Sequence, residues 1–161
     1  MASLAYRQGS WRAGRMSASA ATQAEFPPEA PSIDSGQDLV PEWAPKTGAA
    51  LRELLRLPPG WNHRNARPVA VKALRGVIAA LNSSMRHDSP APDVIPLATG
   101  GLQLEWHLHQ MDIELSVGHG GERSVYVRDR QTGEEWEGDI GVDLRLADAI
   151  DCLTQRRRQH P

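Results

Sequence analysis

The fold is decided by the stretch Gly100-Gly101-Leu102-Gln103-Leu104-Glu105-Trp106-His107-Leu108-His109 and by the segment Asp112-Ile113-Glu114-Leu115-Ser116-Val117 that follows it. Apolar and polar residues alternate with a period of two in both segments, and Gln110-Met111 is the predicted turn between them. This alternation is typical of an antiparallel hairpin that buries one face and leaves the other in solvent. The predicted inward residues are Leu102, Leu104, Trp106, Leu108, Ile113, Leu115 and Val117.

Three shorter segments extend this hairpin into a sheet. Strands are predicted over 93–97, 123–128 and 134–137, between clusters of turn residues. Pro96 has no N–H to donate to a strand ladder, so the segment 93–97 is expected at an edge of the sheet. Because short turns join consecutive strands, the sequence predicts an antiparallel meander of about five strands.

Helices are predicted after Thr47, from Pro68 to about Asn82, and after Asp143. Thr47 and Asp143 are suited to N-caps, and Pro68 is suited to a first helical turn. The predicted apolar stripe of the second helix consists of Val71, Leu74, Val77, Ile78 and Leu81. Because one face of such a sheet needs cover, we expect an α+β fold in which helices cover one face of the meander.

The 161 residues are expected to form one domain and a tail. Residues 1–45 are rich in Ala, Ser, Pro and Gln and are predicted to be disordered or loosely attached, whereas 46–158 form a single α+β domain. Residues 1–23 lack acidic side chains, which resembles a transit peptide in composition. A disordered extension, or a true start at Met16, is the other interpretation.

Composition restricts the partners and the compartment. A net charge of −2 provides no global field for nucleic acid or an anionic membrane, and no apolar run is long enough to span a bilayer. The single Cys152 excludes an intramolecular disulfide and a cysteine zinc site, which fits a reducing cytoplasm. Basic residues are almost all Arg, a usage typical of GC-rich bacterial genomes.

The polar face of the hairpin gathers most of the side chains that could support chemistry. Gln103, Glu105, His107 and His109 are spaced by two and point to one side of a strand. Two histidines at i and i+2 beside a carboxylate can bind a divalent metal, here through His107, His109 and Glu114. Glu105 is the general base in that hypothesis. The competing interpretation is a solvated polar sheet face.

The spacing of these residues resembles the first motif of the cupin family. Gly101, His107-x-His109, Glu114 and Gly121 stand at matching positions, and the resemblance implies that the two histidines and the glutamate are metal ligands. The second cupin motif is missing, and the predicted helices leave too few strands for a jelly-roll barrel. We therefore expect no cofactor, with a divalent metal as the alternative.

A second resemblance covers about residues 55–120. The elements Pro59-Gly60-Trp61-Asn62, Arg67-Pro68, Pro90-x-Pro92 and Gly100–Trp106 resemble a group of small bacterial proteins that pair a Gly-Trp-Asp/Asn loop with a Gly-Gly-x-x-Leu-Glu-Trp strand. The group has no established activity, so the resemblance implies a fold and a bacterial origin.

This resemblance singles out Trp61, Asn62 and Glu105 as candidate partner-binding residues, because exposed Trp is enriched in interface hot spots. In the structural interpretation, Trp61 packs its loop against the sheet and Glu105 accepts hydrogen bonds from the loop 61–65. Trp106 is expected to anchor the core.

The leading hypothesis is a non-enzymatic, cytoplasmic protein-interaction module of bacteria. Its size, its exposed polar sheet face and an edge strand at 93–97 fit an antitoxin, an immunity protein or an accessory protein of a mobile element. The expected partner is another protein or a second copy of the chain, with no membrane and no nucleic acid. A small metalloprotein built on His107, His109 and Glu114 is the alternative.

Overall fold

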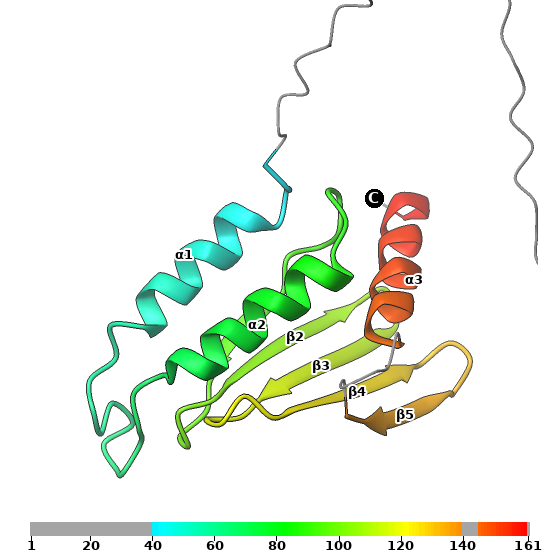
Figure 1. Ribbon diagram of the computed structural model, residues 1–161. Coiled ribbons are helices and arrows are strands. Elements are labelled where there is room, and N and C mark those ends of the chain that lie inside the picture. Colours follow the sequence, from blue (N-terminus) through cyan, green and yellow to red (C-terminus); the bar gives the residue numbers. More distant parts are fainter. Residues whose placement is uncertain (1–39, 140–144, 161) are drawn as a thin grey trace, which may run out of the picture. The chain divides into compact units, whose positions relative to one another are not determined.

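The computed structural model describes residues 40–139 and 145–160, and it confirms the predicted α+β architecture (Figure 1). Its elements, in chain order, are α1 (Ala44–Leu54), α2 (Val71–Ser84), β1 (Asp93–Pro96), β2 (Leu102–Leu108), β3 (Met111–Val117), β4 (Arg123–Asp129), β5 (Glu135–Gly138) and α3 (Arg145–Gln159). The strands form one antiparallel sheet in the order β1-β2-β3-β4-β5. No helix in these two ranges is long and apolar enough to cross a membrane.

The central hairpin turns one residue earlier than the sequence predicts. Leu108 pairs with Met111, so the turn residues are His109 and Gln110, whose φ angles are 48° and 63°. A two-residue turn with positive φ at both positions matches the twist of the flanking strands. Met111 is only 3% exposed, and its burial explains the shift, because Met111 as a turn residue would leave its side chain in solvent.

One face of the sheet forms the floor of the core. The buried inward residues of β2 and β3 are Leu102, Leu104, Trp106, Met111, Ile113, Leu115 and Val117. The indole N–H of Trp106 also donates to the carbonyl oxygen of Pro90 at 2.8 Å. Leu108 is the exception to the predicted face: it lies beside the turn and is 43% exposed.

All three helices lie on this face of the sheet (Figure 1). α1 packs on β1, α2 on β2 and β3, and α3 on β4. The buried residues of α2 are Ala73, Val77, Ala80 and Leu81. The predicted stripe is therefore rotated, since Val71 and Ile78 are exposed. Small residues face the sheet because the helix lies close to it: a Cβ on Gly76 would stand 2.7 Å from Cγ1 of Val117.

The predicted start of the first helix is wrong. α1 begins at Ala44, so Thr47 lies inside the helix and is not its N-cap. The Thr47 side chain is buried, and its hydroxyl has no hydrogen-bond partner. Thr47 lies inside the helix because its side chain packs against the core. As an N-cap it would lie at the end of the helix.

The second helix, in contrast, starts later than predicted, at Val71, so Pro68 precedes its first turn. The N–H groups of Arg67 and Ala70 donate to the oxygens of Ala98 and Gly100, each at 2.9 Å. These bonds hold the segment extended against the β1–β2 turn. Residue 143, the predicted N-cap of the last helix, lies outside the described residues.

The folded part begins before the predicted boundary at residue 46. The N–H of Glu42 donates to the oxygen of His87, and the indole N–H of Trp43 donates to the oxygen of Arg86, both at 2.9 Å. These contacts tie the start of α1 to the loop after α2. The rest of the predicted tail, residues 1–39, lies outside the described residues.

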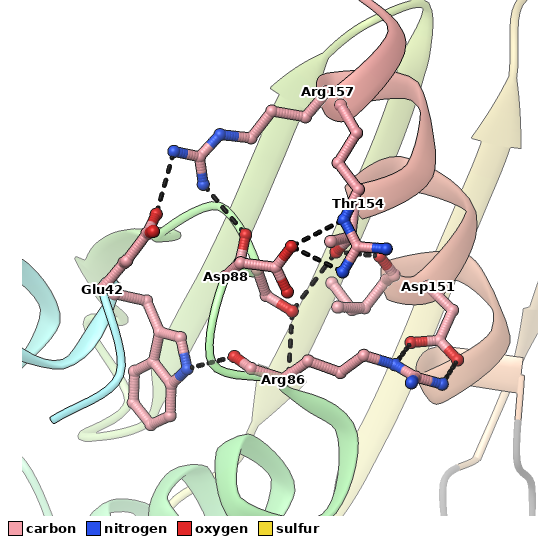
Figure 2. Close-up of polar contacts among 10 residues, drawn as sticks. Glu42, Arg86, Asp88, Asp151, Thr154 and Arg157 are labelled. Atoms are coloured by element: carbon pink, nitrogen blue, oxygen red, sulfur yellow. Dashed lines mark hydrogen bonds and ion pairs between the residues drawn. The ribbon is translucent and has the colours of Figure 1, made fainter. Parts of the chain in front are cut away.

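Ion pairs from α3 fasten this helix to the α2–β1 loop and to the start of α1 (Figure 2). Arg157 donates to the backbone oxygen of Asp88 at 3.0 Å and to the carboxylate of Glu42 at 3.1 Å. Arg86 and Asp151 form a two-pronged pair. Three segments distant in sequence are thus joined at one end of the domain.

Arg156 makes the most enclosed of these contacts. It donates to both carboxylate oxygens of Asp129, at 3.1 and 2.5 Å, and to the backbone oxygen of His109 at 3.2 Å. The hairpin turn with its two positive φ angles is therefore held by a side chain from α3.

We expect Gly76→Ala to lower the free energy of unfolding by about 1–2 kcal/mol, because the added methyl meets buried Val117 and overpacking outweighs the gain in helix propensity. Gly48→Ala in α1 is the control: its Cβ would come no closer than 3.5 Å to the Arg52 side chain, so stability should rise by about 0.5–1 kcal/mol. Urea unfolding measures both, and changes of the same sign would contradict the close packing.

Arg156→Ala should cost about 2–3 kcal/mol of stability, because the largely buried Asp129 then loses its ion-pair partner and keeps only backbone N–H bonds. Arg158→Ala removes a neighbouring arginine whose pair with Asp88 is far more exposed, with side-chain exposures of 60% and 33% against 17% and 14% for Arg156 and Asp129. We expect it to cost less than about 1 kcal/mol. Thermal and urea unfolding test the ranking, and equal losses would show that Arg156 does not hold the turn.

Candidate functional site

The face of the sheet opposite the helices carries the candidate site. We call it the open face, because no helix of the described ranges packs on it. The strand registers assign it these residues: Asp93 and Ile95 on β1; Gln103, Glu105 and His107 on β2; Asp112, Glu114 and Ser116 on β3; Ser124, Tyr126 and Arg128 on β4; Glu135 and Glu137 on β5.

Two carboxylates stand side by side at the centre of the open face. Glu105 on β2 lies directly opposite Glu114 on β3. The side-chain amide of Gln103 bridges them, with its nitrogen 2.9 Å from Oε1 of Glu105 and 3.0 Å from Oε2 of Glu114. Like charges at directly opposite positions destabilise a strand pair. The amide satisfies one oxygen of each carboxylate but carries no charge, so both negative charges remain on the face.

His107 lies between two carboxylates next to this pair. Its Nδ1 is 2.8 Å from Oδ1 of Asp112, and its Nε2 is 3.2 Å from Oε2 of Glu105. Hydrogen bonding to Asp112, and then to Glu105, raises the pKa of His107 above its ordinary value, against the opposing effect of burial. With both ring nitrogens facing carboxylates, the protonated imidazolium is the form that this geometry favours.

Asp112 is held by a second cation as well. Arg130, just beyond β4, donates Nε to Oδ2 of Asp112 at 2.6 Å and pairs with Oδ1 through Nη2. The hydrogen bond from Arg130, together with that from His107, lowers the pKa of Asp112 to about 2. A continuous polar chain therefore runs over β2 and β3 to Arg130.

The open face has an excess of negative charge. Its acidic residues are Asp93, Glu105, Asp112, Glu114, Glu135 and Glu137; its basic residues are His107, Arg128 and the adjoining Arg130. Lys46 of α1 also adjoins the face and pairs with Asp93 at 2.9 Å, so six acidic groups against three basic ones leave a formal charge of −3, or −2 with His107 protonated. The open face is therefore a surface of net negative charge.

The predicted metal ligands are only partly brought together. His107 and Glu114 share the open face, but His109 lies in the turn with φ 48°. A turn at Gln110-Met111 would have placed Glu114 opposite His107; the observed turn shifts the register by two residues and places Asp112 there. Among the described residues, no three His, Cys, Asp or Glu side chains are grouped to hold a metal ion. The metal site stays a prediction from sequence.

Trp61 and Asn62 make their hydrogen bonds within their own loop. The indole N–H of Trp61 donates to the oxygen of Arg67 at 3.2 Å. Oδ1 of Asn62 accepts from the N–H groups of Arg64 and Ala66, at 3.0 and 3.3 Å. Through these bonds, both side chains stabilise the conformation of the loop. The side-chain partners described for Glu105 are on the sheet, so its predicted bonds to loop 61–65 are not among them.

Sequence reasoning missed several members of the open face. Gln103 was expected on this face, but its bridge was not, because the bridge depends on Glu105 lying opposite Glu114, and the position of the turn decides that. Arg130 reaches Asp112 from beyond the end of β4. The alternation of the hairpin could have identified the face, but only the register identifies the partners on it.

Comparison of the chain with protein-family models, with curated proteins and with solved structures gave no match. The two resemblances seen in the sequence therefore stay predictions, and the functional argument depends on the geometry of the open face.

The raised pKa of His107 predicts a pH-dependent contribution to stability. A folded-state pKa above the unfolded value means that the contribution is complete below about pH 6.5 and is lost as pH rises through the folded-state pKa. His107→Gln should therefore cost about 0.2–1 kcal/mol at pH 5.5, and this difference should shrink towards pH 9. Asp112 stays ionised throughout this range.

Urea unfolding of both proteins from pH 5.5 to 9 measures the effect. His87→Gln, which changes an exposed histidine on the far loop after α2, is the matched control. A stability difference for His107→Gln that is constant over this range would contradict the double carboxylate contact.

Proposed function

We propose that this chain is a protein-interaction module that binds a basic surface of another protein through the open face of its sheet. The observation that carries the proposal is the Glu105–Glu114 pair at the centre of that face. Placing two carboxylates at directly opposite positions costs stability, and a partner's Lys or Arg in contact with both would recover it.

The side chains of the open face support this proposal because they are already fixed. Gln103 and His107 each contact two acidic side chains, and Arg130 grips Asp112 with two nitrogens. Ordering flexible side chains is a large part of the cost of association. A network that is ordered before binding reduces that cost. Strand spacing and rise give the face dimensions of roughly 20 by 20 Å.

The edge strand β1 is a poor alternative surface. The N–H of Leu97 donates to the oxygen of Gly101, so alternation along the ladder turns the backbone groups of Val94 and Pro96 outward. Pro96 has no N–H, which leaves Val94 as the single outward donor of β1. Proline at outward edge positions is a known protection against strand pairing. The predicted partner pairing at 93–97 is therefore disfavoured.

For the biological setting, we propose the bacterial source and the cytoplasmic location that the sequence suggests. The Arg-rich, Lys-poor composition supports a bacterial source, and the single cysteine supports a cytoplasmic one. Binding without catalysis fits an antitoxin, an immunity protein or a mobile-element accessory protein.

We expect Glu105→Lys to abolish capture of the partner. The full chain, tagged, is used as bait in an extract of the cells that produce it, and the captured protein is quantified. Charge reversal at the centre of the open face should reduce capture by about tenfold or more, since it repels a basic partner. Glu53→Lys, the same change at an exposed site on α1, is the control and should retain capture.

Circular dichroism and thermal unfolding must show that both variants are folded. A partner that binds the wild type and both variants equally would remove the open face from the proposal. Recovery of no partner, together with no self-association of the chain, would remove protein binding altogether.

A further inference from the structure

The other edge of the sheet, β5, differs from β1 in the number of backbone N–H groups that point outward. The N–H of Asp129 donates to the oxygen of Glu134 at 2.9 Å, so alternation turns the backbone groups of Trp136 towards β4 and those of Glu135 and Glu137 outward. None of the described residues pairs with this outer edge. β5 therefore presents two outward N–H groups and contains no proline, whereas β1 presents one.

The β5 segment is strongly acidic. Between residues 134 and 139 the chain reads Glu-Glu-Trp-Glu-Gly-Asp, and all four acidic residues are exposed. Glu135 and Glu137 point to the open face, so a strand added to β5 would bring its own side chains directly opposite them. Lys or Arg suits these positions. A second copy of β5 does not, because glutamates would then face glutamates.

A pocket lies on the helix side of the same strand. It has a volume of about 620 Å³ between the start of α3 and the ends of β3, β4 and β5. Its lining is mixed: Met111, Val127, Trp136 and Ala149 are apolar, and Asp129, Glu134, Glu135, Arg145 and Asp148 are charged. Trp136 lies flat along β5, over Gly138, where a Cβ would stand 2.5 Å from the ring. The guanidinium of Arg145 lies over the indole, 5.0 Å from its centroid.

These three features describe one binding surface. In strand addition, backbone bonds provide affinity, and alternate side chains provide specificity through the two faces of the sheet. Residues of an added strand opposite Glu135 and Glu137 would lie on the open face, and the residue between them would lie beside Trp136 and the pocket.

We infer that β5 binds an extended segment of the partner protein as a sixth strand, with a basic–apolar–basic pattern. The two basic side chains pair with Glu135 and Glu137, and the apolar side chain packs against Trp136 in the apolar part of the pocket. This inference rests on the proposed function and names the partner segment, since the added strand extends the acidic open face by one more strand.

The probe is a blocked heptapeptide that alternates Lys and Val, and the protein is the full chain. Amide hydrogen exchange measured by NMR reports on the edge directly. The outward N–H groups of Glu135 and Glu137 should exchange rapidly in the free protein and at least about tenfold more slowly at saturating peptide. The N–H of Trp136, which already bonds to β4, should change little. The same peptide with Glu in place of Lys should not bind.

Two variants at one position separate backbone from charge. Glu137→Pro removes an outward N–H and leaves the β4–β5 bonds intact, so it should weaken peptide binding by about tenfold or more without unfolding the sheet. Glu137→Gln keeps the N–H and should weaken binding only a few-fold. The double change Glu135→Lys and Glu137→Lys should reverse the preference towards the Glu-Val peptide.

Binding of the Lys-Val peptide without protection at Glu135 and Glu137, or undiminished binding to Glu137→Pro, would overturn the strand addition. So would failure of the peptide to bind the wild type. These results leave the proposed function testable by itself: partner capture that is lost in Glu105→Lys and retained in Glu137→Pro supports the open face and rejects β5.

Discussion

The register of the β2–β3 hairpin is the constraint on which the rest of the structure depends. Burial of Met111 moves the turn to His109 and Gln110, two non-glycine residues in the left-handed region, where each costs of the order of 1 kcal/mol. The oxygen of His109 accepts from Arg156, and that of Gln110 accepts from the N–H of Arg130. Core packing on one side and hydrogen bonds on the other thus stabilise one turn.

The composition of the open face follows from that register. A turn one residue later would keep every side chain on the same face, because the register then shifts by two. The opposite partners would change: Glu114 would face His107 and not Glu105. The observed turn instead creates a carboxylate pair bridged by Gln103 and places His107 beside Asp112. The register therefore decides which charged groups lie next to each other on the open face.

The two edges of the sheet differ in what they present to a partner strand. β1 is covered by α1 and limited by proline, whereas β5 presents outward donors, acidic side chains and an aromatic residue beside a pocket. The α3 arginines brace the same region, since Arg156 holds Asp129 at the end of β4. The proposed binding surfaces are therefore the β5 edge and the open face.

The sequence by itself determined the architecture: alternation placed β2 and β3 with Trp106 inward, short turns implied the meander, and Pro96 marked an edge. Local periodicity suffices there because a side chain's face depends only on parity. Tertiary structure alone decided the rotation of α2, set by the contact of Gly76 with Val117, and the partners on the open face. The rotation and the partners both depend on which residues meet across strands and helices. Close packing of Met111 and Val117 decides those contacts, and a local sequence pattern does not contain that information.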